Sequence, residues 1–181
     1  LSGHYDHPGT IKGNVYKGAD GDASGAAAVI AAAESLTRFP PQHDVIIALL
    51  DAEEIGLLGA RAFVRNPPID ASRIAININL DMVSRSETSE LYVAGTYHTP
   101  ALIPLVDRVI ATAPTTLLIG HDRPEDGPND WTSQSDHGPF HDAGYPFLYF
   151  GVEDHPGYHD PTDDYAAITH YFFPRRVHTV S

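Results

Sequence analysis

Cysteine is absent from this chain of 181 residues. The absence excludes a disulfide framework, a thiolate zinc site and a cysteine nucleophile. Basic residues are scarce as well: 24 acidic side chains outnumber 11 basic ones, only Lys12 and Lys17 are lysines, and the net charge is −13. This balance argues against a nucleic-acid partner and against docking on anionic lipid. No apolar run approaches the about 20 residues that span a bilayer, so the sequence predicts no membrane span.

The residues that are present indicate one globular domain over 1–181. Hydrophobic residues make up 42% of the chain, which is typical of a folded protein with a sizeable core. Eleven histidines occur, several beside aspartate, and together these side chains form the ligand set for zinc and similar divalent ions. The abrupt start at Leu1 and a helix-like end over 171–181 suggest a piece of a longer protein, truncated at both ends. A missing signal peptide is therefore uninformative.

Strands and helices alternate along the chain, which predicts an α/β fold. We expect a doubly wound, mostly parallel sheet with helices on both faces. Residues 1–6 are read as the tail of a strand and 7–19 as a loop. Further strands are predicted at 44–50, 74–80, 90–95, 115–119 and 146–152, and helices at 26–36, 57–65, 100–113 and 136–143.

The most informative stretch is the pair Glu53 and Glu54, which follows the apolar run 45–50 after Asp51 and Ala52. That run reads as a strand buried on both faces, and ligands bind at the carboxyl ends of strands in open α/β sheets. Successive residues of an extended chain point in opposite directions, so one glutamate can hold a metal while the other faces substrate and water. The alternative is a solvated loop with two surface carboxylates.

Three more candidate ligands each follow a separate predicted strand: His4, Asp81 and His159. The carboxyl ends of parallel strands meet at one rim, so these side chains are expected to form a metal centre with the glutamate pair. Aspartates stand close to both histidines, as expected when a ligating imidazole gives its other N–H to a carboxylate. Four other histidines are expected to be surface residues: His98, His121, His141 and His155.

The acidic loop before the helix at 26–36 has two readings. Asp20 and Asp22 lie near the positive end of that helix, for which Ser24 is a plausible N-cap. The loop is therefore either a helix start or a ligand loop, and its own residues leave both open.

Six short motifs together resemble the M28 metallopeptidases, which are zinc aminopeptidases with two adjacent metal ions. The motifs follow the family's order and cover nearly the whole chain: Gly3-His4-Tyr5-Asp6-His7, Gly18-Ala19-Asp20-x-Asp22-Ala23-Ser24-Gly25, Asp51-Ala52-Glu53-Glu54-x-Gly56, Asn79-Leu80-Asp81-Met82, Ser135-Asp136-His137 and Tyr158-His159-Asp160-Pro161-Thr162-Asp163. The resemblance implies that His4 and Asp81 bind one zinc and that Glu54 and His159 bind the other. It further implies that Glu53 is the general base and that Asp6 orients His4.

One position departs from the family pattern. The family bridges its two metals with an aspartate three residues before the serine of the Ser-Gly pair, and this chain has Gly21 there. Asp20 and Asp22 flank the glycine, and either is a candidate to replace the bridging ligand. We expect Asp22 to do so, because it stands closer to the Ser24 helix start.

The resemblance implies a zinc-dependent exopeptidase, most simply an aminopeptidase acting on peptides with a free N-terminus. It also implies a secreted or periplasmic location. Two rivals remain. A glutaminyl-cyclase-type transferase on the same fold works with one zinc, which the missing bridging aspartate would suit. A non-catalytic binding domain would keep the fold with an impaired metal site.

Overall fold

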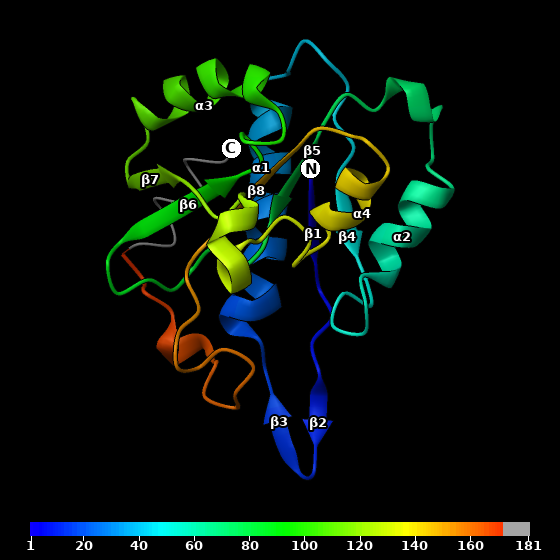
Figure 1. The fold of residues 1–181 in the computed structure, drawn as a ribbon. Coiled ribbons are helices and arrows are strands. Elements are labelled where there is room, and N and C mark those ends of the chain that lie inside the picture. The colour runs from blue at the N-terminus through cyan, green and yellow to red at the C-terminus, as the bar shows by residue number, and fades with distance from the viewer. Residues whose placement is uncertain (172–181) are drawn as a thin grey trace.

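A six-stranded sheet forms the centre of the computed structural model, which describes residues 1–171 (Figure 1). All neighbouring strands are parallel except β6 and β8, so the mostly parallel sheet predicted above is confirmed. The predicted C-terminal helix falls almost wholly on residues 172–181, outside the described part. The strands in spatial order are β4 (Ala48–Leu50), β1 (Ser2–His4), β5 (Asn77–Leu80), β8 (Phe147–Gly151), β6 (Glu90–Ala94) and β7 (Thr116–Ile119).

Helices cover both faces of this sheet, and the alternation of β5 shows why. Leu80 is fully buried in the main core with Val29 of helix α1 (Ser24–Arg38). The neighbouring Asn79 points to the other face, where its amide donates to Ser135 Oγ at 2.9 Å, just before helix α4 (His137–Asp142). Helix α2 (Leu58–Arg65) packs on α4, and α3 (Ile103–Ile110) lies against β7.

The strand before the glutamate pair differs from the prediction. Only Ala48–Leu50 of the predicted 44–50 is regular strand, and it is not buried on both faces, because Leu49 is 39% exposed. In the described part of the chain β4 is an edge strand that pairs with β1 alone, which leaves its outer side uncovered. Its carboxyl end nevertheless lies beside that of β1, with His4 opposite Leu50.

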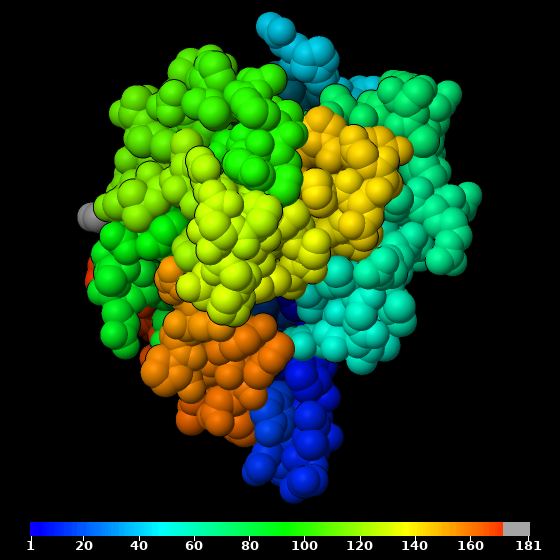
Figure 2. Space-filling model, viewed as in Figure 1, coloured from blue at the N-terminus to red at the C-terminus, as the bar shows by residue number. Residues whose placement is uncertain are grey.

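A hairpin occupies part of the predicted loop 7–19. Strands β2 (Gly9–Ile11) and β3 (Asn14–Tyr16) pair antiparallel, and both turn residues have positive φ, 51° at Lys12 and 86° at Gly13. Positive φ at both central positions is typical of the tight turns that match strand twist. The hairpin projects from the body of the molecule, next to the segment after β8 (Figure 2).

Short helical turns complete the described chain: η1 (Ala19–Ala23, a π-helical turn), η2 (Ala71–Arg73), η3 (Pro100–Leu102), η4 (Pro124–Asn129) and η5 (Tyr165–Ala167). Within residues 1–171, no helix has both the length and the apolar character that crossing a bilayer demands.

Candidate metal centre

The ends of β1, β4 and β5 bring three of the predicted residues together. His4, Glu53 and Asp81 each offer one ligand atom, and these atoms all lie within 4.8 Å of one another. His4 Nε2 is 3.3 Å from Asp81 Oδ1, and both side chains are almost completely buried. Imidazole nitrogen with carboxylate oxygens suits zinc, so the donor set fits the metal that the sequence predicts.

Asp6 ties the first strand end to the glutamate pair. Its carboxylate accepts the backbone N–H of Glu53 at 2.9 Å and that of Glu54 at 3.2 Å. The same carboxylate lies 3.5 Å from His4 Nδ1, and the backbone carbonyl of Asp6 lies 3.1 Å from that nitrogen. Because a carbonyl only accepts, His4 donates through Nδ1 and turns Nε2 toward Asp81.

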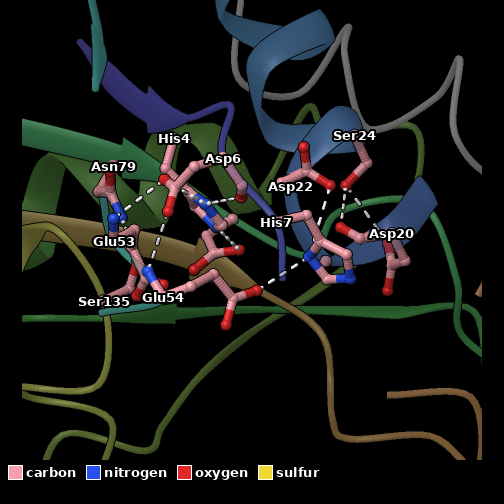
Figure 3. Close-up of polar contacts among 12 residues, drawn as sticks. His4, Asp6, His7, Asp20, Asp22, Ser24, Glu53, Glu54, Asn79 and Ser135 are labelled. Carbon is pink, nitrogen blue, oxygen red and sulfur yellow. Dashed lines mark hydrogen bonds and ion pairs between the residues drawn. The ribbon is translucent and has the colours of Figure 1, made fainter. Parts of the chain in front are cut away.

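Beside the first group, which is His4, Glu53 and Asp81, lies a second group formed by Glu54, His159, His7 and Asp22. One carboxylate oxygen of Glu54 is 3.1 Å from His159 Nε2, as the predicted pairing of these residues requires. The other oxygen is 2.8 Å from Nδ1 of His7, a residue that the sequence analysis did not assign. Asp22 Oδ1 stands 3.7 Å from the same nitrogen (Figure 3). The side chains of this group come from four segments: the turn that holds Glu53 and Glu54 (the glutamate turn), the segment after β1, the acidic loop and the loop after β8.

Asp20 does not join either group, contrary to its candidacy as a ligand. Its Oδ1 accepts the backbone N–H and the hydroxyl of Ser84, at 2.6 and 2.7 Å, and the N–H of Arg85 at 3.1 Å. Its Oδ2 is 3.1 Å from Nε2 of His155. With its carboxylate fully engaged, Asp20 fastens the acidic loop to the chain after β5.

The same contacts correct two further expectations. His155 was interpreted as a surface residue, but its side chain is only 6% exposed because it packs against Asp20. Ser24 is not an N-cap: it is the first residue of α1, and its hydroxyl donates to the Asp20 carbonyl at 2.8 Å. Asp163 holds the loop from the other side, since its carboxylate accepts the N–H groups of Asp20 and Gly21.

The backbone is strained at three positions that border these groups. Ala52, Met82 and His159 have positive φ values of 60°, 52° and 50°. Such angles cost about 1–3 kcal/mol for a residue with a side chain, and they concentrate at functional sites. Here they fall directly before Glu53, directly after Asp81 and on a candidate ligand itself.

Burial and crowding shift the pKa values in both directions. Burial, reinforced by the charge of Asp81, raises the pKa of Glu53 to about 8. Burial alone would lower the pKa of His4, but Asp81 outweighs it by charge and hydrogen bonding and raises that pKa to about 11. For Glu54 the effect of burial is outweighed by the imidazoles of His159 and His7, which bring its pKa to about 2. His4 and Glu53 of the first group thus hold their protons tightly, because several negative charges lie close together there.

Comparison with known proteins identifies this site's family. The model of peptidase family M28 matches residues 1–180. The chain belongs to peptidase family M28. A curated relative, aminopeptidase YwaD of Bacillus subtilis, is 30% identical over 161 residues, which are 84% of this chain and 34% of that protein. This M28 chain therefore spans about a third of the length of that relative.

Solved structures share the fold. A zinc aminopeptidase from Bacillus subtilis matches this M28 chain with a TM-score of 0.79 at 26% identity, over 99% of this chain and 43% of the other. A glutaminyl cyclase of Bacteroides thetaiotaomicron, bound to N-acetylhistamine, matches with a TM-score of 0.76 at 20% identity, over 99% of this chain and 69% of the other. At that identity the second likeness shows the fold alone. The predicted family and fold class are both confirmed.

Sequence reasoning missed two residues of this M28 site. His7 lies within the first motif, one residue after Asp6, and that adjacency was the signal available for it. Asp136 also lies within a quoted motif but received no role. It is fully buried, neither of its carboxylate oxygens has a hydrogen-bond partner, and burial raises its pKa to about 7.

Zinc binding at pH 7 is expected to release at least about one proton from the metal-free protein. With a pKa near 11, His4 carries a proton at pH 7, and its ring must lose that proton to donate Nε2 to a metal. The apparent zinc affinity should therefore rise with pH between 7 and 9, by about tenfold per unit for one proton. Calorimetric titrations in buffers of different ionisation enthalpy measure the proton count. Enthalpies independent of the buffer would contradict the assignment.

Replacing Asp20 and replacing Asp22 are expected to have different effects: the first on stability, the second on zinc binding. Asp20→Ala removes the acceptor of the buried Ser84 N–H and of the partly buried Arg85 N–H, and it should lower the free energy of unfolding by about 2–4 kcal/mol. Asp22 Oδ1 has no hydrogen-bond partner, and burial raises the pKa of Asp22 to about 6, so Asp22→Ala should cost little stability but weaken zinc binding. Urea unfolding of metal-free protein and zinc calorimetry separate the two effects. Equal loss of stability in both variants would show that Asp22 is structural as well.

Proposed function

We propose that this protein is a zinc-dependent exopeptidase, an aminopeptidase that removes residues from peptides with a free N-terminus. The observation that carries the proposal is the convergence of His4, Glu53 and Asp81 within 4.8 Å, with Glu54 and His159 paired alongside. The M28 family match and the likeness to a zinc aminopeptidase support it.

The residues take the roles that the family pattern assigns. His4 and Asp81 would hold one zinc, and Glu54 and His159 would hold a second. Zinc at such a site lowers the pKa of a bound water to about 7 and polarises a carbonyl group. Asp6 supports both sides: it orients His4 and fixes the backbone of the glutamate turn.

Glu53 is the residue that moves a proton. In the metal-free protein, burial raises the pKa of Glu53 to about 8. A neighbouring cation would lower that pKa and leave the carboxylate free to accept a proton from water. Glu53 would then return the proton to the nitrogen of the departing amine, which leaves as the neutral product.

The surroundings favour a cationic substrate terminus. Asp22, Glu53 and Asp136 all have raised pKa values because burial opposes their negative charge. Bound zinc or a free α-ammonium group would relieve that penalty, whereas an acetylated N-terminus would not. The acidic surroundings are therefore compatible with an aminopeptidase.

A glutaminyl-cyclase-type activity is the second candidate, and Gly21 is the observation that favours it. Without a carboxylate at that position the two zinc sites have no shared ligand there, and a cyclase works with a single zinc. The glutaminyl cyclase match shows that the same fold accommodates that reaction, though its 20% identity shows nothing more.

A pair of substrates separates the two. The full-length protein should release p-nitroaniline from leucine p-nitroanilide and leave the N-acetylated compound intact. It should hydrolyse a peptide with N-terminal glutamine without forming a cyclic product. Cyclisation without hydrolysis would establish the second candidate instead, and neither reaction would argue for a binding domain.

A further inference from the structure

The space beside Gly21 is occupied by the ring of His7. A Cβ atom added to Gly21 would lie 3.0 Å from Cε1 and 3.5 Å from Nδ1 of that ring. The family pattern places the aspartate shared by both metals at this position. In this chain an imidazole therefore stands where that side chain would extend.

The His7 ring is buried, and its polar neighbours are the carboxylates of Glu54 and Asp22. Its side chain is 6% exposed, and neither ring nitrogen makes a hydrogen bond. Buried polar groups without partners are costly, so each one in a native site requires an explanation. Asp22 Oδ1, 3.7 Å from His7 Nδ1, is buried and without a hydrogen-bond partner as well. The unsatisfied atoms thus cluster in one place.

His7 also lies beside Glu54, a proposed ligand of the second zinc. Nδ1 is 2.8 Å from Oε1, yet the two atoms are not aligned as a hydrogen bond. Two ligands of one tetrahedral zinc lie about 3.3 Å apart and point at the ion. Among the described residues only His4, Glu53 and Asp81 already have the spacing of a metal group, so His7, Glu54 and His159 would have to shift toward one ion when zinc binds. The His7 and His159 rings have centroids 6.1 Å apart, and each contacts a different oxygen of Glu54.

We propose that His7 is a ligand of the second zinc, together with Glu54 and His159, and takes the place of the missing bridging aspartate. Two histidines and one glutamate form a ligand set known for catalytic zinc, which leaves a fourth position open. The inference rests on the proposed metal centre but not on the reaction it performs. It implies that the second zinc is held without a carboxylate from position 21.

Zinc stoichiometry tests the assignment. Metal-free full-length protein, titrated with zinc by calorimetry and checked by elemental analysis, should bind two ions per chain. His7→Ala should keep one tight site and weaken the second by at least about 100-fold. The retained site reports that the variant is folded. His43→Ala, which alters an exposed histidine before β4, should bind two ions like the wild type.

A double variant supplies the sharper test. In Gly21→Asp alone, the new side chain meets the His7 ring, so the affinity of the second site for zinc should not rise. If the space beside Gly21 were free, the new carboxylate would raise that affinity. In His7→Ala/Gly21→Asp the ring is gone, and the new carboxylate should restore the second zinc. If His7→Ala loses both ions, recovery in the double variant still supports the proposal, and no recovery overturns it.

Three results would overturn the role of His7. In the first, His7→Ala binds two zinc ions as tightly as the wild type. In the second, the wild type binds one ion and His7→Ala keeps it. In the third, His7→Ala loses the second ion and the double variant fails to regain it. Each leaves the proposed peptidase activity open to its own test, because hydrolysis of leucine p-nitroanilide by the wild-type protein is measured separately. A protein that binds no zinc at all would instead refute the proposed function.

Discussion

Replacing Glu53 with Gln is expected to lower kcat by roughly two to four orders of magnitude while the protein keeps its zinc. Glutamine has nearly the same shape, but its amide cannot accept a proton from water. The glutamate turn should hold its position, because Asp6 binds the backbone N–H of residue 53 and not its side chain. Steady-state hydrolysis and zinc content, measured on the same preparation, check both halves of the expectation.

The position of Glu53 makes this test informative. Its carboxylate stands within 4.8 Å of the ligand atoms of His4 and Asp81, close enough to be a ligand itself. Loss of zinc together with activity would show that Glu53 binds metal and that its role has been exchanged with that of Glu54. Glu34→Gln, on the exposed side of α1, is the matched control and should change neither quantity.

His159→Ala is expected to remove the second zinc and reduce activity by at least about 100-fold. The side chain reaches Glu54 from the loop after β8, and that contact is the largest cause of its raised pKa. Removing the ring takes a nitrogen donor from the site and leaves the His4–Asp81 pair untouched. Elemental analysis should then find one zinc per chain in place of two.

Two other histidines show whether the effect is specific. His170→Ala, at an exposed position beyond η5, should retain two zinc ions and full activity. His155→Ala should lose stability instead, since its ring packs against buried Asp20. If His159→Ala kept two ions while His155→Ala lost one, the wrong histidine of this loop would have been assigned.

The meeting of several strand ends at one rim was predictable from sequence, because alternating strands and helices indicate a parallel sheet. Once the sheet is parallel, His4, Glu53 and Asp81 must meet at one rim, and the structure places them there. Their roles as ligands and base remain predictions. The edge position of β4 was not predictable, because a short apolar run looks the same in a central strand and at an edge.

The acidic loop resisted prediction for a different reason. Asp20 and Asp22 are two residues apart and chemically identical, so the sequence offers no basis for knowing that a π-helical turn separates their directions. The Asp20 carboxylate accepts the N–H groups of Ser84 and Arg85, and the Asp22 carboxylate faces His7. The partners of Asp20 lie more than 60 positions away along the chain, and the direction of each aspartate depends on such tertiary contacts of the loop.

The central claim is that zinc held at this rim makes the protein an aminopeptidase. The most direct measurement is the rate of leucine p-nitroanilide hydrolysis by the full-length protein, first after chelation and then during stepwise addition of zinc. The account predicts that chelation abolishes hydrolysis and that zinc restores it as the sites fill. Hydrolysis that persists after elemental analysis shows the metal to be gone would contradict it.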